Sequence, residues 1–320
     1  MIQLIRFKFC LILFVFSTLI YAQSVPGKEE NIPYLTTFSK QGDTRWGDND
    51  YSQTWYFIVP KDLQKPFYIR VFDPDVCGSL DEIKSDCGSK TKFSIFGGKG
   101  AYPQAKGANA AAEIKDKKGT LLTSKVFGSN PEFDNNWFSF GPFNPSEGDY
   151  IEDFEGYIFR VVADGLDGND GNLYKYFMST SATENKPIEG GNVLTFEYTF
   201  RMHEKQGAVS HIYPFLTNDV TAVKINVFDL DDDCYMRLVS VSKKGEKITG
   251  SKDNEWSESV HSIVEEEKKT SLDIQIIKFK DKPNNNIVIA ITNQYGVSLP
   301  FYSIPIGGVP KYKYKIGVKQ

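Results

Sequence analysis

The sequence predicts an all-β protein made of two tandem antiparallel β-sandwich domains, jelly-roll-like in arrangement. Two observations predict this class. Short segments rich in aromatic and β-branched residues recur between Gly, Pro, Asn and Asp residues, as strands do between turns. Two of these segments, with their acidic ends, also repeat one another in the same order, which indicates a duplicated unit. No segment shows a helical period over three turns, apart from a short Ala-rich stretch at 105–114.

The expected strands fall into two groups on either side of a polar, turn-rich segment at 180–191. They are 54–59, 67–72, 92–96, 157–162 and 173–178, followed by 193–202, 220–228, 235–241, 272–278 and 287–292. We therefore assign 1–23 to a signal peptide, 24–182 to the first domain and 190–320 to the second. Residues 97–133 are expected to form loops on one edge of the first sandwich, used either for recognition or to shield that edge. A polar turn is expected at 264–269, and a lysine-guarded edge strand at 311–315.

The internal repeat consists of two short motifs. Val71-Phe72-Asp73-Pro74-Asp75 recurs as Val227-Phe228-Asp229-Leu230-Asp231, and Asp134-Asn135-Asn136-Trp137 recurs as Asp253-Asn254-Glu255-Trp256. Because both motifs occur in both units, Trp137 and Trp256 are expected to be equivalent, buried core residues.

The N-terminus carries the features of an export signal. Arg6 and Lys8 precede the apolar run 9–20, and Ala22 supplies a small residue near a cleavage point before Ser24. Cys10 lacks the small-residue approach of a lipidated cysteine, so no lipid anchor is expected. The mature chain is expected to be periplasmic or secreted, with no transmembrane segment. A net charge of −4 argues against a nucleic-acid partner.

The cysteine spacing predicts one disulfide. Cys77 and Cys87 flank a short loop rich in Ser, Asp and Gly, which a bridge would hold in an oxidising compartment. Cys234 is then a buried small residue, a free thiol, or the partner of Cys77 or Cys87 in a link between domains. Zinc is not expected, because no Cys-x-x-Cys or paired His accompanies these positions.

Acidic residues at the predicted strand ends suggest calcium. Asp229, Asp231 and Asp233 follow one another at i, i+2 and i+4, a spacing that can turn three carboxylates toward a hard cation. They do not form an EF-hand, because Ser240 stands at the twelfth position. A second loop, 163–172, interleaves acidic residues with glycines and is either a cation loop or a flexible turn. We expect calcium bound at separate sites by Asp73, Asp75, Asp164, Asp167, Asp170, Asp229, Asp231 and Asp233, with solvated turns as the alternative.

No catalytic motif accompanies these loops. His203, His211 and His261 lie far apart, outside any Gly-x-Ser-x-Gly or His-Glu-x-x-His pattern. An aromatic content of 14% leaves room for a sugar-stacking platform, and Trp46 is the candidate for an exposed ligand contact.

The sequence resembles two families. The run Tyr157-Ile-Phe-Arg-Val-Val162 with Asp167-Gly-Asn-Asp-Gly-Asn-Leu-Tyr-Lys-Tyr-Phe177 resembles bacterial pre-peptidase C-terminal jelly-roll domains, which are secreted accessory modules. Over about residues 30–315 the chain is more similar to the sandwich region found ahead of OmpA-like domains in Gram-negative outer-membrane proteins. The segments that carry this second resemblance are 71–75, Phe140-Gly-Pro-Phe-Asn-Pro145, Tyr213-Pro-Phe215, Asp253-Asn-Glu-Trp256 and Ile304-Pro-Ile-Gly-Gly-Val-Pro-Lys-Tyr312. The sequence ends at Gln320 without an OmpA-like domain, so peptidoglycan anchoring is not expected.

The expected function is that of a non-catalytic, envelope-associated binding or structural module, stabilised by calcium, with an envelope protein or a glycan as partner. The alternative is a secreted hydrolase acting on glycans, since a glycosidase needs only two carboxylates across a cleft.

Overall fold

The computed structural model describes residues 32–47, 51–103, 119–282, 286–302 and 308–309. Within these ranges the regular structure is β strand with four 3₁₀ turns, and the two large sheets are antiparallel, so the predicted all-β sandwich is confirmed. The short strands β10 and β21 form a separate parallel pair. The predicted signal peptide, the Ala-rich stretch 105–114 and the lysine-rich strand 311–315 lie outside the described residues. No helix in the described ranges has the length and apolar character needed to span a membrane.

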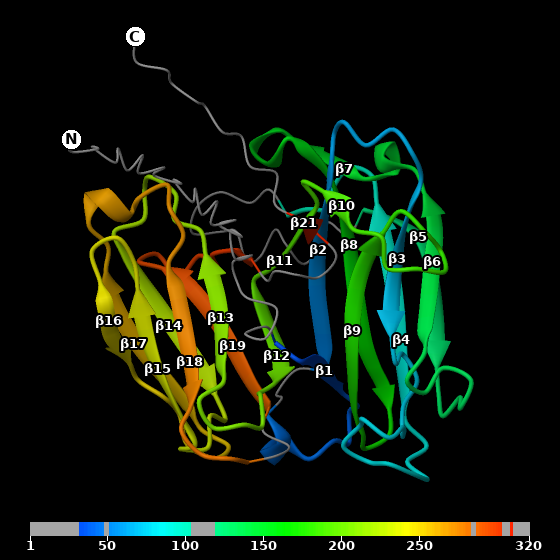
Figure 1. The fold of residues 1–320 in the computed structure, drawn as a ribbon, viewed down its shortest axis with the longest axis horizontal. Coiled ribbons are helices and arrows are strands. Elements are labelled where there is room, and N and C mark those ends of the chain that lie inside the picture. Colours follow the sequence, from blue (N-terminus) through cyan, green and yellow to red (C-terminus); the bar gives the residue numbers. More distant parts are fainter. Residues whose placement is uncertain (1–31, 48–50, 104–118, 283–285, 303–307, 310–320) are drawn as a thin grey trace, which may run out of the picture.

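Strands β1 to β9 make up the first half of the chain, on the right in Figure 1. Their bounds are β1 Tyr34–Phe38, β2 Ser52–Pro60, β3 Phe67–Phe72, β4 Lys90–Gly97, β5 Thr120–Phe127, β6 Trp137–Phe143, β7 Asp149–Ile151, β8 Gly156–Asp167 and β9 Gly171–Ser179. The 3₁₀ turns η2 Thr44–Trp46, η3 Pro145–Glu147 and η4 Glu152–Phe154 connect them. Strand β5 lies inside 97–133, so the expectation that this insertion forms only loops is wrong.

Strands β12 to β19 make up the second half, on the left in Figure 1. Their bounds are β12 Glu197–Arg201, β13 Val209–Pro214, β14 Ala222–Phe228, β15 Cys234–Val239, β16 Lys244–Ile248, β17 Trp256–Ser262, β18 Asp273–Lys278 and β19 Asn286–Asn293. The expected polar turn at 264–269 contains η5 Glu265–Glu267. Four short strands lie between the halves: β10 Ile188–Glu189, β11 Asn192–Thr195, β20 Phe301–Tyr302 and β21 Gly308–Val309. The single strand expected at 193–202 is divided at Phe196, so that β11 and β12 belong to different sheets.

Both sheets continue from one half into the other. The eight-stranded sheet has the order β17-β14-β19-β12-β1-β9-β3-β6. The eleven-stranded sheet has the order β16-β15-β18-β13-β20-β11-β2-β8-β4-β5, with β7 added beside β8. The predicted domain boundary falls between β9 and β11, and β11 pairs back with β2 of the first half.

Each half has the strand order of a jelly roll. In the first half β1, β9, β3 and β6 form one sheet and β2, β8, β4 and β5 the other; in the second half β12, β19, β14 and β17 face β13, β18, β15 and β16. Taken in chain order, each strand of the first half except β7 therefore has a counterpart in the second, with β3 equivalent to β14 and β6 to β17. The sequence repeat falls on these two equivalent pairs.

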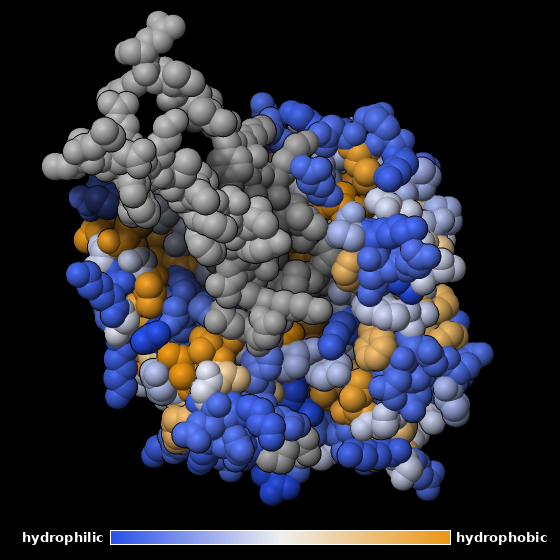
Figure 2. All heavy atoms as spheres, viewed as in Figure 1, coloured by the Kyte–Doolittle hydropathy of each residue, from blue (hydrophilic) through white to orange (hydrophobic). Residues whose placement is uncertain are grey.

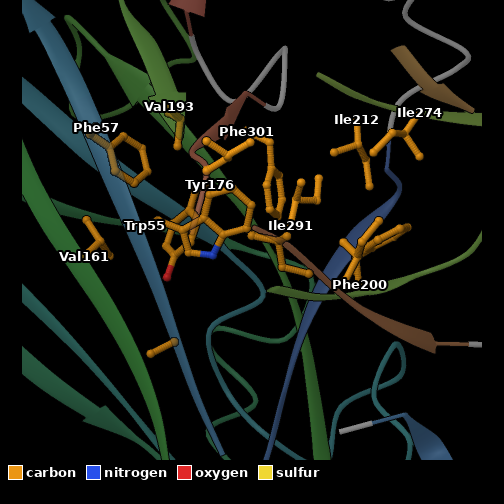
Figure 3. Packing of buried hydrophobic residues seen from close by; sticks show 14 of the residues in the cluster. Trp55, Phe57, Val161, Tyr176, Val193, Phe200, Ile212, Ile274, Ile291 and Phe301 are labelled. Atoms are coloured by element: carbon orange, nitrogen blue, oxygen red, sulfur yellow. The ribbon is translucent and has the colours of Figure 1, made fainter. Parts of the chain in front are cut away.

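One hydrophobic cluster fills both halves. Trp55, Phe57 and Tyr176 of the first half and Phe200, Ile212, Ile274 and Ile291 of the second belong to it. Figure 3 shows Phe301 of β20 between the two groups. The two halves are thus joined by shared sheets and by shared apolar packing, which fixes the orientation of the loops at the strand ends.

A buried polar contact also joins the halves. Arg201, at the end of β12, forms an ion pair with Glu82 from the loop after β3, and the two side chains are 9% and 4% exposed. Asn286 of β19 accepts a hydrogen bond from Arg201 Nε (2.9 Å) and donates one to Glu82 Oε1 (2.7 Å). Because removal of one partner leaves a buried charge without its counter-charge, this pair should be sensitive to substitution.

Glu82→Gln is expected to lower the free energy of unfolding by on the order of 3 kcal/mol. The matched control is Glu155→Gln, which breaks the exposed pair with Lys61 (2.9 Å, side chains 60% and 51% exposed). That control should cost less than about 1 kcal/mol. Chemical denaturation curves measure both, and equal losses in the two variants would contradict a structural role for the junction.

Candidate metal centre

The two sequence motifs of each repeat meet in space. Phe72 pairs with Trp137 across β3 and β6, and Phe228 pairs with Trp256 across β14 and β17. The ring centroids are 5.3 Å apart in both pairs. The residues after Phe72 and Phe228 are therefore brought against the residues before each Trp, which are the acidic parts of the motifs.

The backbone of the two motifs has the same unusual conformation. Asp73 and Asn135 have φ angles of 56° and 56°, and Asp229 and Asn254 have 61° and 54°. Asp and Asn tolerate this left-handed region better than other residues with a side chain, because their short polar groups bond locally. In each half the Asn N–H donates to the first Asp carboxylate at 2.6 Å. The repeated sequence thus specifies a repeated loop geometry.

In the first half this geometry gathers three carboxylates. One oxygen each of Asp73, Asp75 and Asp134 lies within 4.8 Å of the others. Asp73 is 0% and Asp75 2% exposed. Asp73 Oδ2 and Asp75 Oδ1 are buried and have no hydrogen-bond partner among the described residues. Buried polar atoms are nearly always bonded, so two such oxygens in one cluster require either a proton shared between Asp73 and Asp75 or a bound cation.

Without a bound cation, the charged form of this first cluster is unfavourable. Burial raises the pKa of Asp75 to about 7, and the negative charges of Asp73 and Asp134 add to the effect. Burial also raises the pKa of Asp73 to about 6, against the hydrogen bond from Asn135. Among the described residues no lysine or arginine forms an ion pair with any of the three. A divalent cation would supply the positive charge that the protein does not.

The second half gathers Asp229, Asp231 and Asp253 in the same way, again within 4.8 Å. Here Lys282 Nζ lies 2.6 Å from Asp231 Oδ2. Burial raises the pKa of Asp229 to about 7. Asp233, expected to act with Asp229 and Asp231, instead turns inward and forms a fully buried pair with Lys278 (2.7 Å).

The structure does not bring the acidic residues of loop 163–172 together as one cluster. Asp164 lies on β8 and accepts a hydrogen bond from Ser52 Oγ (2.8 Å), while Asp167 is exposed at the end of β8. Asp170 is buried and accepts hydrogen bonds from the backbone N–H groups of Cys77 (2.8 Å) and Ile83 (2.7 Å). Asp170 therefore fixes the loop after β3 through hydrogen bonds.

That loop is closed by the predicted Cys77–Cys87 disulfide, whose Cα atoms are 5.8 Å apart. A Cβ on Gly78 would meet Asp134 Oδ1 at 2.7 Å, so the absence of a side chain lets Asp134 approach the loop. The disulfide and Gly78 hold the segment after Asp75 against Asp134. Cys234 is a buried free thiol, and burial raises its pKa to about 12.

Tryptophan positions differ from the sequence-based expectation. Trp256 is 45% exposed, so its assignment to the core is wrong. It lies on β17, the last strand of the eight-stranded sheet, and among the described residues its one ring contact is with Phe228. Trp137 is half-buried beneath the Arg70 guanidinium (5.0 Å), and Trp46 is half-buried against Phe38 (6.1 Å). Trp55 is the tryptophan of the core.

Two histidines are bonded to carboxylates, which the sequence did not predict. His211 Nδ1 lies 2.8 Å from Asp273 Oδ1. His261 Nδ1 lies 2.5 Å from Glu246 Oε1, and its Nε2 lies 3.3 Å from Ser259 Oγ. The His261 side chain is 3% exposed. His211 and Asp273 are 62 positions apart and His261 and Glu246 are 15 apart, so no local sequence motif predicts these two pairs.

Comparisons with known proteins add little to this geometry. No family model matches the sequence, and no curated protein matches it. Among solved structures, the VP2 subviral particle of infectious bursal disease virus aligns with a TM-score of 0.18 and 11% identity, covering 89% of this chain and 80% of that chain. The Gt strain of the same virus aligns with a TM-score of 0.17 and 9% identity, covering 88% and 73%. Scores this low carry no argument about fold or function.

The raised pKa values predict how stability depends on pH when no cation is bound. Because the folded state holds protons on Asp73 and Asp75 above their ordinary range, both groups favour folding below about pH 4. That contribution is lost as the pH rises through about 6 to 7. In chelator, Asp75→Asn should therefore stabilise the protein at pH 8 by on the order of 2 kcal/mol and have little effect at pH 4.

Thermal unfolding in chelator at the two pH values measures this difference. Asp167→Asn is the control, because that side chain is exposed at a strand end and should change stability little at either pH. Identical melting of the wild type and Asp75→Asn at pH 8 would show that no uncompensated charge is buried there.

Proposed function

We propose that the protein is a secreted or periplasmic, calcium-stabilised binding or structural module of the cell envelope. The observation that carries the proposal is the pair of buried, unbonded oxygens of Asp73 and Asp75 facing Asp134. A folded protein that buries two such carboxylates must protonate them or bind a cation, and at pH 8, above both raised pKa values, a cation offsets their charge. The Cys77–Cys87 disulfide supports an oxidising compartment, and the envelope setting rests on the sequence resemblance and the export signal.

Calcium fits the donor set best. The three residues offer oxygen atoms only, which favours calcium or magnesium over zinc. Calcium binds oxygens at about 2.3 to 2.6 Å, so two ligands on one ion lie at most about 5 Å apart. The cluster oxygens lie within 4.8 Å of one another, so one cation of this size can contact all three residues. Calcium also accepts irregular coordination, whereas magnesium demands near-ideal octahedral geometry at about 2.0 to 2.1 Å.

The partner is proposed to contact the exposed side of the sandwich. On the face shown in Figure 2, hydrophilic residues surround smaller hydrophobic areas. Trp256 and Val260 of β17 are 45% and 60% exposed, and β17 is the outermost described strand of its sheet. An indole with an open face can stack on a sugar ring or pack on a protein, and Trp256 is therefore a better contact candidate than half-buried Trp46.

Calcium should raise the melting temperature of the protein at pH 8 by several degrees. An ion at 100 times its dissociation constant, bound to the native state alone, contributes about 2.7 kcal/mol. Asp73→Asn and Asp75→Asn should remove this shift, while Asp164→Asn should retain it, because Asp164 is bonded to Ser52 outside the cluster. Superimposed melts of the wild type in millimolar calcium and in chelator would refute calcium stabilisation.

A second candidate function, hydrolysis, is favoured by one observation. Ser259, His261 and Glu246 form a series in which the histidine contacts the serine through Nε2 and the glutamate through Nδ1. A histidine held in this way can accept a serine proton during attack on an ester, for instance an acyl group on a glycan. Release of acetate from acetylated glycans by the wild type but not by Ser259→Ala would support this function, and its absence in both would exclude it.

A further inference from the structure

We propose that the second half of the protein carries a built-in substitute for the calcium ion. The ammonium group of Lys282 is placed at the cluster of Asp229, Asp231 and Asp253, where the equivalent cluster of the first half requires a divalent cation. Of these two equivalent clusters, only that of the first half would then bind calcium, so each chain would bind one ion. The inference rests on the proposed calcium site of the first half and extends it to its counterpart.

The two clusters are equivalent in detail. Each consists of an Asp-x-Asp after the third strand of its jelly roll and an Asp-Asn before the sixth. The backbone N–H of Asp73 donates to Asn136 O (2.9 Å), and that of Asp229 donates to Glu255 O (3.2 Å). Together with the two matching Asn-to-Asp bonds, these contacts set the carboxylates in corresponding places. A difference in ligand must therefore come from the surroundings.

The surroundings differ in the charge carried by one segment, the residues at and after the end of β18 and of its counterpart β8. Lys278 and Lys282 lie at the end of β18 and just after it, and they pair with Asp233 and Asp231. The first-half counterpart of β18 is β8, and the segment at and after its end carries Asp167 and Asp170 and no lysine. Where the second half supplies two positive charges to its acidic loop, the first half supplies further negative ones. Among the described residues, the cluster of Asp73, Asp75 and Asp134 is therefore the one of the two without a paired lysine.

An ammonium group suits the second cluster because that cluster is more open. Asp253 is exposed, and the side chains of Lys282 and Asp231 are 37% and 17% exposed. Burial works against the charge of Lys282, but its hydrogen bond to Asp231 and the nearby Asp233 and Asp229 raise its pKa overall. Lys282 therefore stays charged at neutral pH and holds Asp231 without an ion from solution.

Equilibrium dialysis of the purified mature chain against calcium chloride at pH 8 tests the inference by counting bound ions. The wild type should bind one ion, and Asp75→Asn none. Lys282→Gln should bind two, because its second cluster loses the ammonium and regains the need for a cation. Lys282→Arg, which keeps the positive charge, is the matched control and should bind one.

The outcomes distinguish failure of the inference about Lys282 from failure of the proposed calcium site in the first half. One ion in both the wild type and Lys282→Gln would overturn the role of Lys282 and leave the calcium site of the first half standing. No ion in the wild type would refute that calcium site, whereas one ion in Lys282→Gln would still support the substitution by lysine. Should Lys282→Gln fail to fold, Lys282→Met, which also removes the charge, takes its place: one ion in the wild type and two in Lys282→Met support the inference, and two ions in the wild type overturn it.

Discussion

A buried carboxylate must meet a positive charge or take up a proton, and this constraint governs the chemistry of the whole molecule. In the eight-stranded sheet, the equivalent strands β3 and β14 are each followed directly by a buried aspartate. The chain supplies lysines to the second set, through Lys278 and Lys282. Among the described residues no lysine pairs with Asp73 or Asp75, whose pKa values rise to about 6 and about 7. The pKa of Asp229, which Lys282 does not contact directly, also rises to about 7. The same physical demand is thus met in two ways, and the proposed role of calcium follows from the first half alone.

The duplicated architecture makes this comparison possible. Each jelly roll presents the same strand ends with the same left-handed Asp and Asn residues, so one half serves as a reference for the other. The loop after β3 differs by its disulfide and by the hydrogen bonds of Asp170, which hold Asp75 near Asp134. A site that is held rigid before binding loses less entropy when an ion arrives. The proposed calcium site of the first half is in this respect held in place before an ion binds.

Much of this fold could be predicted from the sequence because its strands are short, apolar and bounded by turn residues. β3 was predicted residue for residue, while β5 was missed because its polar and apolar residues do not alternate and half of its side chains are exposed. The site was predicted in part. Asp73 and Asp75 were recognised, but Asp134 was not, although it stands in the repeated motif. Asp233 was grouped with Asp231 by spacing, which assumes a regular backbone; positive φ angles at Asp231 and Asp232 break that alternation. Lys282 reaches Asp231 across 51 positions, a contact that local patterns do not contain.

The most direct measurement of the central claim is the number of protons released when calcium binds. Calorimetric titration of the wild type at pH 6.5, in two buffers of different ionisation enthalpy, gives this number. If the ion displaces protons from Asp73 and Asp75, with pKa values of about 6 and about 7, release of about one proton per ion is expected. Calcium binding without proton release, or no binding, would contradict the account.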